Sequence, residues 1–272
     1  GGPDEQAWPG QWPRVAATRR TRPGARWIGR GWGRGRALRI LHVEGGRRLY
    51  GGAQQVLYLL EGLAARGHAN VLACPAGSAL SRAAAPFAEV RGLTMRGDAD
   101  AAMAWRLGRL MQRTRPDLVH LHSRIGADLW GGVAARWGKI PVIHTRRVDN
   151  PEPRWLVALK YRLHDRVIAI SEGIGRVLLA EGLPAEKLRV VRSAVDWVRF
   201  QRPCERPSAA VRLGVAADAL LVGVVAQLIP RKGHRFLLEV LPPLVQTYPG
   251  LQVLFFGQGP LEPELRGRIA GL

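Results

Sequence analysis

Short apolar runs alternate along the chain with longer stretches in which apolar residues recur every three or four positions. Uninterrupted apolar runs are typical of parallel strands that are buried on both faces of a sheet. The longer stretches have the spacing of amphipathic helices that cover such a sheet. In the first part of the chain the apolar runs predict strands at 38–43, 70–74, 89–95, 118–123, 141–145, 167–170 and 188–191.

Helices are predicted in the segments between these strands. The stretch from 166 to 200 shows the pattern most clearly, as strand, helix and strand. Ser171 stands where a helix N-cap belongs, Glu172 places a negative charge in the first turn, and Gly182 ends the helix. The predicted helices are 53–66, 101–115, 127–137, 153–165 and 172–181. This alternation predicts an α/β fold with a doubly wound parallel sheet.

The pattern changes after residue 200. Pro203, Pro207 and alternating charges predict a linker at 201–215. Two more strands, at 220–226 and 251–256, flank a helix at 236–248 that Pro242 and Pro243 should interrupt. We therefore divide the chain into an extension (1–36), a complete Rossmann-like domain (37–200), the linker and the start of a second domain (216–272). Because so small a sheet leaves one face uncovered, four of its strand residues should be partly exposed, namely Val222, Val224, Val253 and Phe255.

Composition adds a strong positive charge to this picture. The 272 residues include 41 Lys and Arg against 21 Asp and Glu, which gives a formal net charge of +20. Such a charge favours polyanionic partners: nucleic acid, an anionic membrane or phosphorylated sugars. The alternative is that an arginine-rich composition reflects the genome. The two cysteines, Cys74 and Cys204, exclude a disulfide framework and a cysteine-based metal cluster.

Membrane association is a separate question. No apolar run approaches the roughly 18 residues of a spanning helix, so we expect a cytoplasmic protein, either free or at the inner face of the cytoplasmic membrane. The helix at 153–165 has an apolar face flanked by arginine and lysine, and such a helix could lie on an anionic bilayer. Packing against the sheet is the commoner role, and we prefer it.

Residues 1–36 have neither strand nor helix periodicity. They combine tryptophans with many arginines, glycines and prolines. A disordered arm that binds nucleic acid through arginine and tryptophan would have this composition. We prefer the other interpretation, an extension without a structural role, because no recognition motif recurs in it. Nucleic acid is accordingly not the expected partner.

A glycine-rich loop between the first strand and the first helix is the first candidate site. It spans 44–52 and contains Gly45, Gly46, Gly51 and Gly52. Backbone N–H groups and the helix dipole point into such a loop and attract anions.

Polar residues also follow two strands that should end at the same edge of the sheet. His122 and Ser123 close one strand, Thr145 closes the other, and Arg146 and Arg147 come next. Parallel α/β sheets bind ligands at the carboxyl ends of their strands. The paired arginines suit a phosphorylated or carboxylated acceptor; the alternative is a solvated loop pair.

His120 and His122 lie two residues apart and therefore share one face of their strand. A metal pair is conceivable there, but the sequence shows no third ligand at a suitable spacing. We therefore expect no metal site.

Four blocks of sequence resemble, in the same order, one enzyme family. They are YGGAQ at 50–54 with LAARGH at 63–68, DLVHLHS at 117–123, the stretch 166–200, and the loops within 227–234 and 251–261. Together they resemble the retaining family 4 of GT-B glycosyltransferases, the group 1 type. Some positions depart from the family pattern. Ser193 and Ala194 replace Asn-Gly, where Ala tolerates positive φ poorly, Arg147 replaces a His, and Gln227 replaces an Arg.

The resemblance implies a GT-B fold of the α/β class, with one complete Rossmann-like domain and the start of a second. It implies transfer of a sugar from a nucleotide-sugar donor to a saccharide or lipid-linked acceptor of lipopolysaccharide type, with retained configuration and without a cofactor. The residues that it places at the donor phosphates are Gly51, Gly52, Gln227, Arg231 and Lys232. Those on the acceptor or sugar side are His122, Ser123, Thr145, Arg146 and Arg147.

The family's pair of glutamates, which binds the donor sugar and its ribose, does not occur in residues 216–272. The catalytic residues therefore stay unassigned, and we expect a C-terminally truncated enzyme. Two alternatives stay open: a non-catalytic fragment, and a basic protein that acts on nucleic acid through residues 1–36.

Overall fold

The computed structural model describes residues 36–124, 126–150, 152–201 and 205–271, and the extension expected at 1–36 lies outside them except for Arg36. The chain divides into two units, of which the first extends to Ala194 and the second runs from Val195 to Leu272. Each unit is described by itself.

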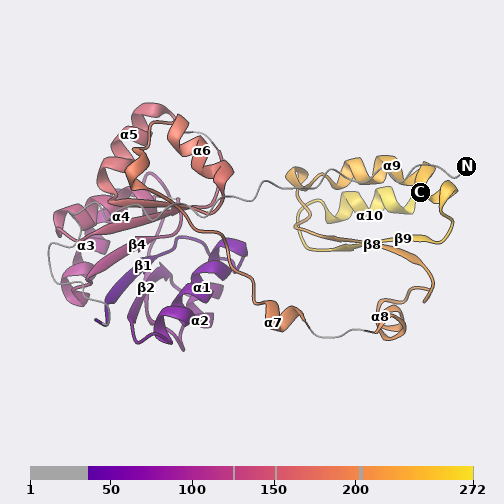
Figure 1. Cartoon of the computed structure of the whole chain (residues 1–272), viewed down its shortest axis with the longest axis horizontal. Coiled ribbons are helices and arrows are strands. Elements are labelled where there is room, and N and C mark those ends of the chain that lie inside the picture. The colour runs from indigo at the N-terminus through magenta and orange to yellow at the C-terminus, as the bar shows by residue number, and fades with distance from the viewer. Residues whose placement is uncertain (1–35, 125, 151, 202–204, 272) are drawn as a thin grey trace, which may run out of the picture. The chain divides into compact units, whose positions relative to one another are not determined.

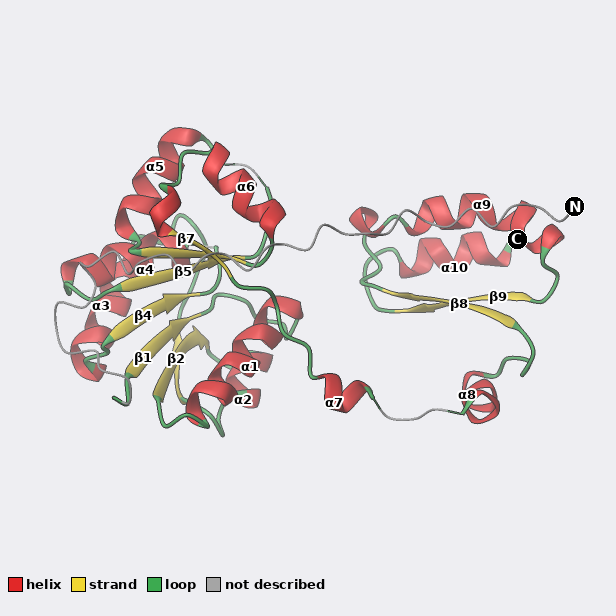
Figure 2. Cartoon of the chain, in the orientation of Figure 1, coloured by secondary structure: helices red, strands yellow, loops and turns green. Residues whose placement is uncertain are grey.

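The first unit is built on a seven-stranded parallel sheet (Figure 2). Its strand order is β3-β2-β1-β4-β5-β6-β7. The bounds are β1 (Arg39–Val43), β2 (Ala69–Pro75), β3 (Glu89–Leu93), β4 (Leu118–Leu121), β5 (Val142–Arg146), β6 (Arg166–Ala169) and β7 (Leu188–Val190). The order reverses between β1 and β4, so the carboxyl ends of these two strands flank the crevice where doubly wound sheets bind ligands.

Helices cover both faces of this sheet, as predicted (Figure 1). One face packs on α1 (Gly51–Ala64) and α2 (Ala79–Ala83) through a core that includes Val56, Leu60 and Leu72. The other face packs on α3 (Ala102–Thr114) and α4 (Ala127–Trp137) through Leu41 and Leu107, among others. The remaining elements are α5 (Arg154–Leu163), α6 (Glu172–Ala180) and the 3₁₀ turn η1 (Ala185–Lys187).

Local signals in the sequence explain several element ends. The Ser171 hydroxyl accepts a hydrogen bond from the Ile174 amide at 3.2 Å and caps α6, as predicted. Gly182 follows that helix with φ of +99°, a conformation that glycine adopts without strain. Within the described residues, positive φ angles occur at two non-glycine positions, Arg115 and Lys139. Ala194 is not one of them, so its backbone stays outside the left-handed region.

The turn at Ala194 is held by a contact that the sequence did not reveal. The side-chain amide of Gln55 on α1 donates to the Ala194 carbonyl and accepts from the Ala194 N–H, both at 2.7 Å. This two-point contact ties the segment after β7 to the first helix.

The second unit contains a parallel pair of strands, β8 (Leu220–Val225) and β9 (Leu251–Phe256). Its helices are α7 (Trp197–Phe200), α8 (Arg206–Leu213), α9 (His234–Thr247) and α10 (Glu262–Ala270), with a 3₁₀ turn η2 (Pro230–Lys232). A small core of Leu228, Leu238, Leu241 and Leu265 joins α9 and α10 to the strands. The partial exposure predicted for Val222, Val224, Val253 and Phe255 is observed.

One local prediction for this unit was wrong, and two of its helices were not predicted. The expected linker contains the helix α8, because Pro207 fits the first helical turn and Gly214 ends the helix in a left-handed conformation. The helix α9 continues through Pro242 and Pro243, and the turn that leads into them is held in the core by Leu238 and Leu241. We also did not predict α10, whose apolar residue Leu265 packs in that core.

Candidate functional site

The loop after β1 is shaped by its own side chains. Ser123, just past β4, accepts a hydrogen bond from the Gly45 amide at 2.7 Å, and Glu44 accepts one from the Gly46 amide at 2.9 Å. Burial raises the pKa of the Glu44 carboxyl, although the Gly46 amide and the Arg147 charge oppose this shift. Ser123 therefore acts on the loop itself, which it fixes at the carboxyl edge of the sheet.

The helix that follows this loop begins with an open anion-binding end. Gly51 and Gly52 form its first turn, the N-cap residue Tyr50 makes no side-chain capping bond, and no acidic residue lies in that turn. The free amides and the positive end of the helix dipole therefore face outward. A Cβ at Gly51 would meet no atom within 4 Å, whereas one at Gly52 would lie 3.5 Å from the Cδ of Arg147.

Arg147 thus lies across the start of α1. Burial lowers the pKa of its guanidinium, and the nearby Glu44 carboxylate opposes that shift. Its buried Nε atom has no hydrogen-bond partner within the part of the chain that the structure describes. A half-buried guanidinium with one unsatisfied donor beside free helix amides forms a site for an anionic group.

Arg146 is directed away from the start of α1, and all three of its guanidinium nitrogens donate hydrogen bonds within the protein. Its side chain is 1% exposed, and Nη1 donates to the Glu152 carboxylate at 3.0 Å. Its Nε donates to the Val148 carbonyl at 2.8 Å, and Nη2 donates to the carbonyl of Asn150. The structure therefore separates the predicted arginine pair: Arg147 faces the crevice, and Arg146 holds the loop after β5 in place.

A groove of about 470 Å³ leads from Arg147 along α1 over the open faces of β4 to β7. Thr145 and His120 lie in its floor, and their side chains share a hydrogen bond of 2.7 Å between Oγ1 and Nε2. Gln55 and Ala194 also line it. Thr145 is thus at the place the sequence predicted, at the carboxyl end of β5 and within reach of the groove.

His122 belongs to a buried cluster rather than to the groove. It lies 2% exposed beside His120 and His42, with ring centroids 3.9 Å and 5.3 Å away. Burial lowers the pKa of all three rings, that of His42 to about 4, so they are neutral at physiological pH. His42 was missed in the sequence because it is far from the other two along the chain; only the register that pairs it with His120 brings them together.

Three of the five predicted donor-phosphate residues lie in the second unit, whereas Gly51 and Gly52 belong to the first. Gln227 follows β8 and is half-buried, while Arg231 and Lys232 are exposed in η2 at the start of α9. The adjoining loop packs closely against this segment: a Cβ at Gly257 would lie 1.8 Å from the Ala226 carbonyl oxygen. These residues therefore gather at the carboxyl ends of β8 and β9, the position at which α/β domains bind ligands.

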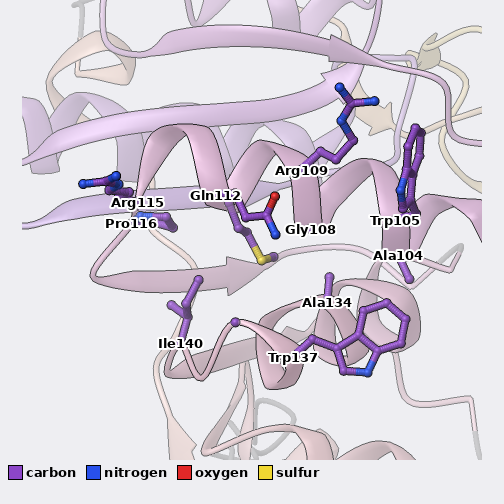
Figure 3. Close-up of a pocket in the computed structure, with 12 residues that line it drawn as sticks. Ala104, Trp105, Gly108, Arg109, Gln112, Arg115, Pro116, Ala134, Trp137 and Ile140 are labelled. Atoms are coloured by element: carbon purple, nitrogen blue, oxygen red, sulfur yellow. The ribbon is translucent and has the colours of Figure 1, made fainter.

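A second, larger groove of about 690 Å³ lies between α3 and α4, on the other side of the sheet (Figure 3). Its most prominent residues are Trp105 and Arg109 on α3 and Trp137 on α4, and the Arg109 guanidinium stacks on the Trp105 ring at 4.8 Å. None of the residues that we predicted for the site lines this groove.

No helix within residues 36–124, 126–150, 152–201 and 205–271 combines the length and the apolarity that crossing a bilayer requires.

Comparison with known proteins places this geometry in a family. The model of Glycosyltransferase Family 4 matches residues 50–199. The D-inositol 3-phosphate glycosyltransferase of Saccharomonospora viridis is 31% identical over half of this chain and 35% of its own length. The same-named protein of Geodermatophilus obscurus is 30% identical over half of this chain and 33% of its own length. The chain thus spans about a third of the length of these curated relatives.

Solved structures share the fold. The HepE protein of Anabaena in complex with UDP and glucose superposes with a TM-score of 0.68 at 17% identity, covering 86% of this chain and 66% of that one. A glycosyltransferase of Rickettsia africae gives a TM-score of 0.72 at 18% identity, covering 86% and 64%. These similarities confirm the α/β fold of GT-B type. Since the family model covers more than half of the residues, the chain belongs to Glycosyltransferase Family 4.

Proposed function

We propose that this chain forms part of an enzyme that transfers a sugar from a nucleotide-sugar donor to a saccharide or lipid-linked acceptor, with retained anomeric configuration. The observation that carries the proposal is the anion site at the carboxyl edge of the first sheet. There the uncapped amides of Gly51 and Gly52 and the half-buried guanidinium of Arg147 converge. Phosphate groups are the anions that such a combination favours.

The relatives support this chemistry. The two relatives in sequence described above are named D-inositol 3-phosphate glycosyltransferase, and inositol 3-phosphate carries a phosphate group. One relative in fold holds UDP and glucose. On this basis Arg147 binds an anionic group of the acceptor or of the donor, and the glycine loop contributes its amides. Thr145 lies in the floor of the groove that Arg147 also lines, and there its side chain would contact a hydroxyl of a bound sugar.

The donor diphosphate is assigned to the second unit. Lys232 contributes a charge-assisted contact, Arg231 contributes a second cation, and Gln227 a neutral hydrogen bond. The work of the protein is to position the donor and to stabilise the diphosphate as it leaves, which needs no cofactor. We place this reaction in the cytoplasm, at the inner face of the membrane where lipid-linked acceptors reside, a position that the net charge of +20 favours.

The test is isothermal titration calorimetry, in which the purified chain is titrated with inositol 3-phosphate and, separately, with UDP-glucose. Losing one charge-assisted contact costs about 1.5–3 kcal/mol, so Arg147→Ala should weaken binding of one of these ligands by about 10- to 150-fold. Arg113→Ala is the matched control, because Arg113 is exposed on α3, the helix that covers the other face of the sheet. Equal affinities of wild type and Arg147→Ala for both ligands would contradict the proposal.

A further inference from the structure

Three histidines from two strands meet inside the first unit, on the sheet face that α1 covers. The parallel register places His42 of β1 directly beside His120 of β4, and His122 follows on the same face just past the end of β4. One ring nitrogen from each lies within 4.8 Å of the other two. All three rings are at least nine-tenths buried.

The hydrogen bonds around His42 determine which of its nitrogens carries the proton. The Asn70 amide group donates to the carbonyls of Leu60 at 2.9 Å and Phe87 at 3.0 Å, so its oxygen is the acceptor for His42. That oxygen lies 3.2 Å from Nε2 of His42, which must therefore be the protonated nitrogen. The neutral ring keeps a lone pair on Nδ1, and this lone pair points at His122.

Nδ1 of His42 and Nε2 of His122 are 3.0 Å apart. Two nitrogens that bind one tetrahedral zinc ion at about 2.0–2.1 Å lie roughly 3.3 Å apart. The two rings are thus already spaced almost as ligands of one ion, and without an ion Nε2 of His122 carries the proton and donates it to Nδ1 of His42. In this arrangement Nδ1 of His122 is a buried acceptor with no hydrogen-bond partner in the described residues, so hydrogen bonding alone leaves this ring incompletely satisfied.

The surroundings resemble the outer shell of a metal site. Asn70 orients His42, and the Thr145 hydroxyl bonds Nε2 of His120 at 2.7 Å; metal-binding histidines are regularly held by such partners. His120 also lines the groove along α1, which offers an ion a way in and a place for a water ligand. The Arg147 charge acts on His120 and His122 and opposes a cation there, while the Glu44 carboxylate lies near Arg147 and offsets part of that charge.

We propose that His42, His120 and His122 bind one divalent transition-metal ion, with Zn²⁺ the best match to three imidazole ligands. The ion would join β1 to β4 at the point where the strand order of the sheet reverses. Its position beneath the groove floor makes it a structural ion, separate from the sugar transfer proposed above.

The experiment uses the untagged, EDTA-treated full chain. Equilibrium dialysis against Zn²⁺ with elemental analysis should find one ion per chain, and Co²⁺ should give the visible absorption of a tetrahedral site. His42→Asn and His122→Gln should each abolish the Co²⁺ spectrum and weaken Zn²⁺ binding at least 100-fold. His164→Gln is the control, because His164 is equally buried but contacts His144 instead of the cluster.

Two results would overturn the proposal. One is wild-type protein that shows no stoichiometric Zn²⁺ and no tetrahedral Co²⁺ spectrum. The other is full binding by His42→Asn and His122→Gln, which would place the ion elsewhere. The wild-type measurement does not depend on the folding of any variant, and near-ultraviolet circular dichroism verifies the fold of each variant that is compared.

Discussion

The strongest test of how the first unit is held together is the replacement of Glu152 by glutamine. Its carboxylate is 4% exposed and faces three cations. Oε1 lies 2.6 Å from Nη2 of Arg124 and 3.0 Å from Nζ of Lys160, and Oε2 lies 3.0 Å from Nη1 of Arg146. Burial by itself would raise the pKa of Glu152, but Lys160 and the two arginines overcome it and leave the pKa lowered, so the group is charged.

The expected cost follows from what the substitution leaves behind. Lys160 keeps an ion pair with Asp128, but Arg146 is 1% exposed and would lose its only carboxylate partner among the described residues. Breaking one side of a buried ion pair costs about 3–5 kcal/mol. A domain is stable by only about 5–15 kcal/mol in total. With a urea dependence of about 2 kcal/mol per molar, the unfolding midpoint should fall by roughly 1.5–2.5 M.

The assay is urea denaturation followed by far-ultraviolet circular dichroism, with hydrogen exchange across residues 142–166 to localise the effect. Glu61→Gln is the control, since Glu61 is an exposed residue of α1 with no ion pair in the described chain. An exposed pair contributes up to about 1 kcal/mol, equivalent to a midpoint shift of about 0.5 M. A shift no larger than that for Glu152→Gln would refute the view that this network secures the loop after β5.

Three further results are expected. Burial lowers the pKa of His164 from 6.5 to about 4, so between pH 6.5 and pH 4 this ring is protonated in the unfolded chain but neutral in the folded one. The stability that the neutral ring contributes is therefore fully present above pH 6.5 and is lost as the pH falls towards 4. Urea denaturation should show that this residue lowers the free energy of unfolding by about 2 kcal/mol at pH 5. Between pH 7.5 and pH 5 the free energy of unfolding of His164→Gln should therefore fall by about that much less than the free energy of unfolding of the wild type. Gly257→Ala should speed hydrogen exchange throughout residues 216–271, because its Cβ would overlap the Ala226 carbonyl; unchanged exchange would show that the loop can shift. Lys232→Ala should weaken UDP-glucose binding by about 10-fold or more in calorimetry, while equal affinity would remove Lys232 from the donor site.

The sequence alone determined the architecture of the first unit and the location of its candidate site. Strand and helix periodicity are local properties, and so is the cap at Ser171, which the structure confirms. Parallel strands must end at one edge of the sheet, so the glycine loop and the residues after β5 could be placed together without coordinates. The sequence blocks added the family, which the match over residues 50–199 confirms, because their order along the chain is itself sequence information.

Only the tertiary structure decided which side chains at that edge are free and which are engaged. Arg146 and Arg147 are neighbours with the same chemistry, but Glu152 and two backbone carbonyls bind the first and leave the second at the crevice. His42 meets His120 through strand register, which no spacing in the sequence encodes. The continuous helix at Pro242 likewise depends on burial of its neighbours. In each case the outcome depends on contacts between distant residues, whose energies exceed the local preferences that a sequence pattern reports.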